Sequence, residues 1–150
     1  MLMSALADQL QADLNASRKA QDKPLTLVLG SLIADVKNRR IELRRDPTDD
    51  EIIDLVRRGI KRRRESVEMY RAGGREDLEA KEASEILLLE RYLPPAVDEA
   101  EVRATARAAV NGGAGNLGAI MGALMKEYKG RVDGSVLNRI AREELAAGMS

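Results

Sequence analysis

Hydrophobic residues recur along most of this chain with the three- and four-residue spacing of an α-helix. Leucines at four-residue spacing follow Ser4, a favourable N-cap residue, and predict a short amphipathic helix over residues 5–19. Pro24 suits a first helical turn, and the apolar residues behind it hold one face of a long helix that ends before the segment DPTDDE. The N-terminal part of the chain therefore begins with two successive helices.

Two further helices are predicted downstream of that segment. Thr48 and Glu51 have the spacing of a capping box, which starts a helix at about residue 49 that ends at a Gly-Gly pair. The segment REDLEAKEASEILLLERYL, residues 75–93, predicts the next helix. The apolar residues crowded near its end indicate that this end is buried.

Two prolines then mark the predicted domain boundary. Pro94 and Pro95 cannot donate backbone hydrogen bonds, and the residue before a proline avoids helical angles, so the helix must end there. We expect an N-terminal helical lobe of long hairpins over residues 1–95 and a C-terminal three-helix lobe over residues 96–150.

The C-terminal lobe is also predicted to be helical. Asp98 and Glu101 have capping-box spacing before a short Ala-rich helix, and the flexible segment NGGAGN follows it. Helices are then expected over residues 117–129 and 135–147. Because no stretch alternates like a strand, the predicted fold class is all-α.

Composition narrows the possible functions. The chain carries 25 basic and 25 acidic residues, so no global charge indicates nucleic acid, and DNA is not an expected partner. Cys and His are absent, which removes disulfides, thiolate zinc sites and the usual general base. Three tyrosines are the only aromatic residues, too few for platforms that stack single-stranded RNA. We predict no catalytic residue, no metal site and no cofactor.

The N-terminus and the hydropathy predict the location. The opening segment MLMSALADQL lacks a basic region and meets an acidic residue early, so it does not predict a secretory signal peptide. No apolar run is long enough to span a bilayer. The expected location is the cytoplasm, with no membrane partner.

The helix predicted over residues 117–129 has two different faces. Gly118 and Gly122 lie four residues apart, so another backbone could approach them, and two lysines follow on the same side. The opposite, core-facing side is predicted to contain Leu117, Ile120, Met121, Leu124, Met125 and Tyr128.

A local excess of basic residues surrounds the turn after this helix. Between positions 126 and 142 the basic residues are Lys126, Lys129, Arg131, Arg139 and Arg142, against Glu127 and Asp133. Lysines at a helix C-terminus stabilise the helix dipole, and Gly130 suits the position after the helix end. On spacing alone, a solvated helix end is favoured over an RNA-phosphate site.

A second basic run, RRGIKRRRE, covers Arg57 to Arg64 and has no assigned role. Glu65 and Glu68 follow at the spacing that would pair them with Lys61 and Arg64, so we interpret the run as a solvated, internally paired helix face. The turn GGRED could offer backbone N–H groups to an anion, but its own acidic residues already occupy that position, and self-capping is the favoured role.

Two segments resemble a known family. The stretch MGALMKEYKGRVDGSVLN resembles the closing motif of the GatB/YqeY family, which includes the tRNA-binding tail of the GatB subunit of glutamine-dependent tRNA amidotransferases. The stretch GGREDLEAKEASEILLLERYLPP resembles the central signature of the free-standing YqeY-like members. With RRIELRR and the chain length, the resemblance covers essentially the whole sequence.

The resemblance implies an all-α, two-part structure and a role near tRNA. In the amidotransferase the related tail contacts the tRNA body, while kinase-like and glutaminase chemistry lies in other domains and subunits. By position, Lys126, Lys129, Gly130 and Arg131 match the basic turn of the tail, and Asn138 matches its following helix. The sequence VDG stands where the amidotransferase tail usually has an Asn-Pro turn, so the resemblance does not define the exact RNA contacts there.

Two hypotheses follow. The first is a tRNA-binding accessory module, linked by resemblance to carbon-nitrogen ligases that use glutamine as amido donor but without its own catalytic centre. Its expected partners are tRNA and components of an amidotransferase or a tRNA synthetase, and its predicted RNA-binding residues are Lys126, Lys129, Gly130, Arg131, Asn138, Arg139 and Arg142. The second is a helical protein-interaction adaptor whose groove at Gly118 and Gly122 receives a partner helix.

Overall fold

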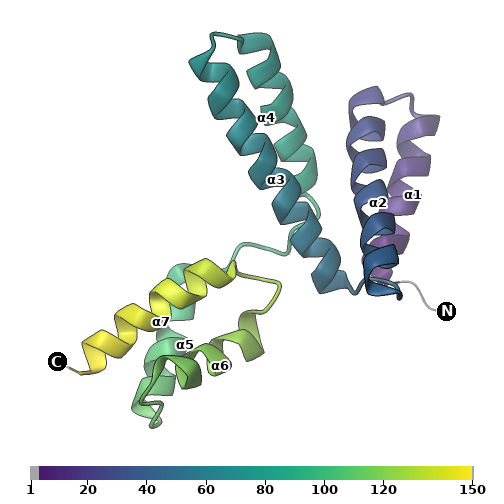
Figure 1. Ribbon diagram of the computed structural model, residues 1–150. Coiled ribbons are helices and arrows are strands. Elements are labelled where there is room, and N and C mark those ends of the chain that lie inside the picture. The colour runs from purple at the N-terminus through teal and green to yellow at the C-terminus, as the bar shows by residue number, and fades with distance from the viewer. Residues whose placement is uncertain (1–3, 150) are drawn as a thin grey trace. The chain divides into compact units, whose positions relative to one another are not determined.

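The fold is entirely helical throughout the part of the chain that is described, residues 4–149 (Figure 1). In this computed structural model those residues form seven α-helices and no strand. The all-α prediction is confirmed. The helices group into two compact units, Met1–Leu93 and Pro94–Ser150. Each unit has its own hydrophobic core.

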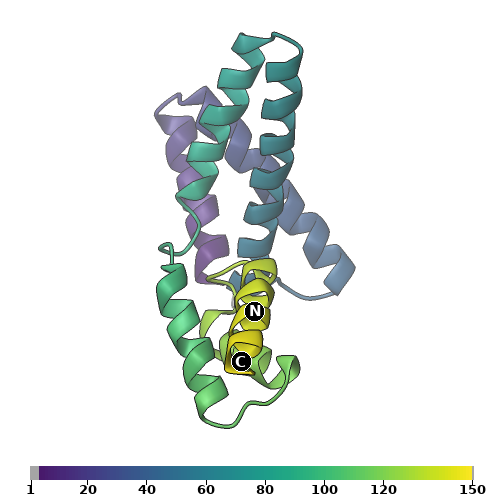
Figure 2. The ribbon, with the colours of Figure 1, turned by 90° about the vertical axis from the view of Figure 1, so that its left-hand side faces the viewer.

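The N-terminal unit contains two helical hairpins. Helices α1 (Ala5–Lys19) and α2 (Lys23–Leu43) form the first, and α3 (Asp49–Ala72) and α4 (Glu76–Glu90) form the second (Figures 1 and 2). Helix α2 contacts both α3 and α4, so the hairpins share one core. The fully buried residues of this core are Leu10, Leu14, Val28, Leu29, Leu32, Ile52, Val56, Ile60 and Leu89.

Local capping explains where these helices begin. The backbone N–H of Ala7 donates to Ser4 Oγ at 3.1 Å, which confirms the predicted N-cap of α1. At α3 the Glu51 N–H donates to Thr48 Oγ1 at 3.2 Å, and the Thr48 N–H donates to Glu51 Oε1 at 3.0 Å. The predicted capping box is therefore present and satisfies two backbone donors that lack helical partners.

The C-terminal unit contains α5 (Glu99–Asn111), α6 (Leu117–Tyr128) and α7 (Gly134–Gly148). Each of these helices contacts the other two. Asp98 caps α5 by accepting from the Ala100 N–H at 2.9 Å, instead of forming the predicted box with Glu101. The buried core of the unit consists of Val102, Ala106, Ile120, Leu124, Tyr128, Leu137, Ile140 and Ala141.

Two positions predicted to be buried are exposed. Met125 was expected on the core side of α6, but 38% of it is accessible. Each helical residue turns about 100°, so Met125 lies beside the stripe that buries Leu124 and Tyr128, at the boundary with solvent. In the apolar run of α4, Leu89 is 1% exposed whereas Leu87 is 66% exposed. Consecutive apolar residues extend around the whole circumference of a helix, and the neighbouring helices bury only one side of it.

Candidate nucleic-acid interface

The turn between α6 and α7 is short and tightly hydrogen-bonded. The backbone N–H groups of Arg131 and Val132 both donate to the Tyr128 carbonyl oxygen, at 2.9 Å and 3.0 Å. Gly130 has a φ of 78°, a left-handed conformation that glycine adopts without steric cost. These bonds fix the path of the chain just after the predicted basic residues of α6.

Tyr128 anchors the turn to the core. Its side chain is 2% exposed, and its hydroxyl oxygen lies 2.8 Å from Thr105 Oγ1 of α5. The guanidinium carbon of Arg131 lies 5.8 Å from the centroid of the Tyr128 ring, within the range of a cation–π contact. The buried ring therefore restricts where the Arg131 charge can lie.

The turn carries three basic side chains against the carboxylates of Glu127 and Asp133. Lys126, Lys129 and Arg131 are exposed, and none of them forms an ion pair with another residue of the 4–149 segment. The nearby Asp133 caps α7 by accepting hydrogen bonds from the Ser135 N–H and hydroxyl, both at 3.1 Å. We call Lys126, Lys129 and Arg131 the basic turn.

The other predicted RNA-binding residues make contacts within the unit. Arg139 lies 2.6 Å from Glu99 of α5 and 3.3 Å from Glu143. Arg142 Nε donates to Asn138 Oδ1 at 2.7 Å. The structure thus separates the basic turn from Arg139, whose charge is already balanced by carboxylates, and from the Arg142–Asn138 pair on α7.

An ion-pair network that was not predicted from the sequence joins α5 and α7. Glu144 is 5% exposed and accepts hydrogen bonds from Arg103 at 3.0 Å and from Arg107 at 3.2 Å. Arg103 also lies 2.6 Å from Glu143. The hydrogen bonds from Arg107 and Arg103 lower the pKa of the Glu144 carboxyl. Position 144 continues the helical spacing of the buried residues Leu137, Ile140 and Ala141 of α7. This spacing was the one feature of the sequence that could have indicated that Glu144 is buried.

The basic run of α3 is paired differently from the prediction. Arg62 lies 3.4 Å from Asp35 of α2, Arg63 lies 2.9 Å from Glu85 of α4, and Arg64 lies 3.6 Å from Glu90 of α4. The predicted partner Glu68 instead pairs with Arg71 at 3.0 Å. The pairing is between helices because α2 and α4 present carboxylates to this face, which the spacing within α3 could not reveal.

Comparison with known proteins assigns the family. A family model described as "Yqey-like protein" matches residues 7–145, which is nearly the whole chain. This chain belongs to the YqeY-like protein family. The predicted membership is confirmed, and the match includes both the signature that spans α4 and the basic turn.

Curated relatives carry the name "Altered inheritance of mitochondria protein 41, mitochondrial". The protein from Pyrenophora tritici-repentis is 30% identical over 145 residues, covering 93% of this chain and 80% of the relative. The Eremothecium gossypii protein is 33% identical over 85 residues, covering 56% of this chain and 46% of the relative. The Saccharomyces cerevisiae (strain YJM789) protein is 28% identical over 91 residues, with 60% and 49% covered. In the last two cases the match spans about half of the relative.

These names correct the expected location. The cytoplasmic prediction is wrong, because the relatives are named as mitochondrial proteins. That prediction depended on the absence of a secretory signal and of an apolar span. Neither feature bears on mitochondrial import, which uses amphipathic, Arg-rich leaders instead. Among the helices of residues 4–149, none is both long and apolar enough to cross a membrane.

Proposed function

We propose that this YqeY-like protein is an RNA-binding accessory module whose basic turn contacts phosphates of a folded tRNA. The observation that carries the proposal is the exposure of Lys126, Lys129 and Arg131 without an ion pair among residues 4–149, in a chain with a formal net charge of zero. Ammonium and guanidinium groups donate to phosphate oxygens, and such contacts supply most of the sequence-independent affinity for nucleic acid.

The rigidity of the turn also supports this proposal. The bonds to the Tyr128 carbonyl oxygen and the contact of Arg131 with the Tyr128 ring limit the positions that the Arg131 charge can take. A charge that is already restricted loses less conformational entropy when it meets a phosphate. Arg139 is less suited to this role, because binding RNA would require it to leave Glu99 and Glu143.

The link to amide transfer is part of the same proposal. We assign any glutamine-dependent chemistry to partner proteins, such as amidotransferase components, and none to this chain alone. The sequence contains no Cys or His, and it shows no phosphate-binding loop or Ser amidase motif. This link to amide transfer rests on the resemblance of the basic turn to the amidotransferase tail.

A matched pair of double variants tests the proposal. Lys129→Ala with Arg131→Ala should weaken binding to folded tRNA and lower the slope of log affinity against log salt by roughly 0.7 to 0.9 for each lost phosphate contact. The control is Arg18→Ala with Lys19→Ala, which removes the same charge from the exposed C-terminal end of α1. The control should retain both the affinity and the slope.

Two results would count against RNA binding at the basic turn. One is an unchanged affinity and salt slope in the Lys129→Ala, Arg131→Ala variant, and the other is an equal loss in the control. The first result would favour the helical adaptor. Gly118 and Gly122 of α6 are exposed, and a Cβ added at Gly122 would meet no atom within 4 Å, so a partner helix has room there.

A further inference from the structure

A small pocket lies between α1 and α2 of the N-terminal unit, beside the segment that leads into α3. Its volume is about 90 Å³. In Figure 2 the two helices separate toward the C-terminal end of α2, which is the end where the pocket lies. The residues that line it are Ser4, Ala7, Leu10, Gln11, Ile33, Val36, Lys37, Arg40, Asp46 and Pro47.

The floor of the pocket is apolar. Leu10 is 1% exposed, Pro47 is also buried, and Ala7, Ile33 and Val36 complete the lining. A cavity of about 150 Å³ with such a lining takes up benzene, so a pocket of 90 Å³ matches a smaller group, such as the isopropyl end of a branched aliphatic chain. Burying that chain removes apolar surface from water, which favours binding.

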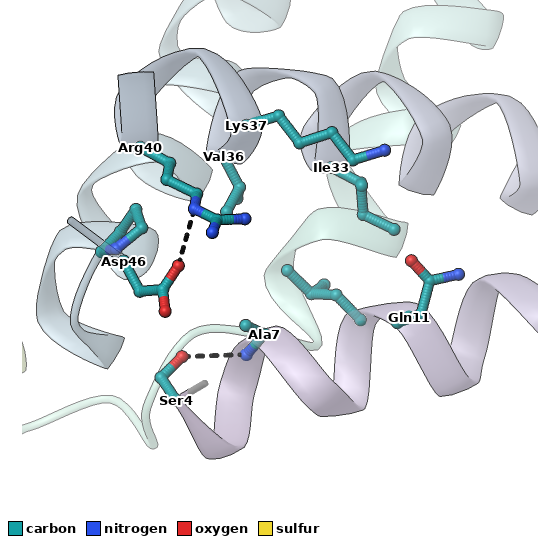
Figure 3. A pocket seen from close by; sticks show the side chains of 10 residues that line it. Ser4, Ala7, Gln11, Ile33, Val36, Lys37, Arg40 and Asp46 are labelled. Carbon is teal, nitrogen blue, oxygen red and sulfur yellow. Dashed lines mark hydrogen bonds and ion pairs between the residues drawn. The ribbon is translucent and has the colours of Figure 1, made fainter. Parts of the chain in front are cut away.

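The mouth of the pocket is basic. In Figure 3 the guanidinium of Arg40 points toward Asp46, and the side chain of Lys37 runs along α2 above Ile33, on the opposite side of the pocket from Ala7 and Gln11. Arg40 Nε lies 2.9 Å from Asp46 Oδ1, so the charge of Arg40 is balanced by a neighbouring carboxylate. Lys37 forms no ion pair with any residue between positions 4 and 149. The mouth therefore carries one excess positive charge.

From these features we infer that the pocket binds a monoanionic carboxylate attached to a short branched aliphatic chain. The aliphatic chain occupies the floor between Leu10, Ile33 and Val36, and the carboxylate lies at the mouth beside Lys37. One excess positive charge matches a carboxylate better than a phosphate monoester, which carries nearly two negative charges at neutral pH. This site is independent of the proposed RNA contact, whose residues belong to the other unit.

Titrations with an acid and its amide test the two parts of the inference separately. Addition of 4-methylpentanoate to the full chain should give saturable shifts of the Ala7, Ile33, Val36 and Lys37 amide NMR signals. The uncharged 4-methylpentanamide should shift the same signals with an affinity about two- to fivefold lower, since it lacks the ion pair at the exposed mouth.

Variants test separately the role of the Lys37 charge and that of the apolar floor. Lys37→Gln should abolish the preference for the acid over the amide, whereas Lys81→Gln, an exposed lysine of α4 outside the pocket, should preserve it. Ala7→Leu places an isobutyl group at the pocket lining and should abolish binding of both probes. If Ala7→Leu fails to fold, the Lys37→Gln variant still tests the inference. Lys37 is exposed, so its replacement should leave thermal unfolding unchanged.

Two sources could supply this chemistry, a free branched-chain acid or the C-terminal aliphatic residue of a peptide. N-acetylleucine presents the same isobutyl group and carboxylate as a C-terminal leucine. Tighter binding of N-acetylleucine than of 4-methylpentanoate would identify a peptide end, and the reverse order would identify a free acid. The inference is overturned if no probe gives saturable shifts at the pocket, or if Lys37→Gln leaves the preference for the acid unchanged.

Discussion

The guanidinium carbon of Arg131 lies 5.8 Å from the centroid of the Tyr128 ring, while the hydroxyl of the same ring lies 2.8 Å from Thr105 Oγ1. One buried side chain thus contacts α5 at one end and the basic turn at its face. The position of the proposed phosphate-binding charge depends in this way on the core of the C-terminal unit.

Removal of the Tyr128 hydroxyl should destabilise this unit without removing the ring beneath Arg131. Tyr128→Phe loses the bond to Thr105 and should cost about 0.5 to 1.5 kcal/mol, the usual net contribution of one hydrogen bond. Thr105→Val should cost a similar amount, and the double variant less than the sum, because both changes remove the same bond. Urea unfolding of all four proteins measures this coupling, and strictly additive losses would contradict it.

The sequence predicted the elements that depend on local chemistry. The Ser4 cap and the Thr48–Glu51 box involve residues three positions apart, so their geometry is already contained in the spacing. The seven helices and their approximate ends follow from such caps and from apolar periodicity. Met125 was placed wrongly because periodicity alone does not define how wide a buried face is.

The candidate site was predictable only in part. The basic turn is a contiguous segment, and its residues were identified from composition and resemblance. Arg139 was grouped with it because its partner Glu99 lies 40 residues away in the sequence, and only tertiary packing brings them to 2.6 Å. Glu144 is separated from Arg103 and Arg107 by 41 and 37 residues, and this separation likewise concealed their contacts.

Adjacent residues of α6 should differ strongly in their contribution to stability. Leu124 is 0% exposed, so Leu124→Ala should cost about 2 to 5 kcal/mol through lost burial and a residual cavity. Met125 is 38% exposed, and Met125→Ala should cost roughly 1 kcal/mol or less. Denaturant unfolding of both variants checks the difference. A loss at Met125 equal to that at Leu124 would show that Met125 is buried in solution.

We also propose that residues 1–95 and 96–150 are separate folding domains. The two core clusters have no residue in common, and each is built from the helices of its own unit. A fragment of residues 96–150 should therefore give amide NMR signals at the positions found in the full chain, although so small a domain is only marginally stable. Collapse of those signals into the narrow range of an unfolded chain would reject the proposed boundary.

The buried carboxylate of Glu144 should make the stability of the C-terminal unit depend on pH. Hydrogen bonds from Arg107 and Arg103 lower the pKa of this group in the folded protein below its ordinary value of 4.5. The ionised form therefore stabilises the fold above the unfolded-state pKa, and this stabilisation is lost as the pH falls through the lower, folded-state pKa. Glu144→Gln should accordingly destabilise the unit at about pH 6 and do so progressively less toward about pH 3.

Urea titrations followed by the amide signals of α5 and α7 measure this difference, with the exposed Glu127→Gln as control. A Glu144→Gln difference that stays constant over that pH range would mean that the ionised carboxylate contributes nothing to the fold.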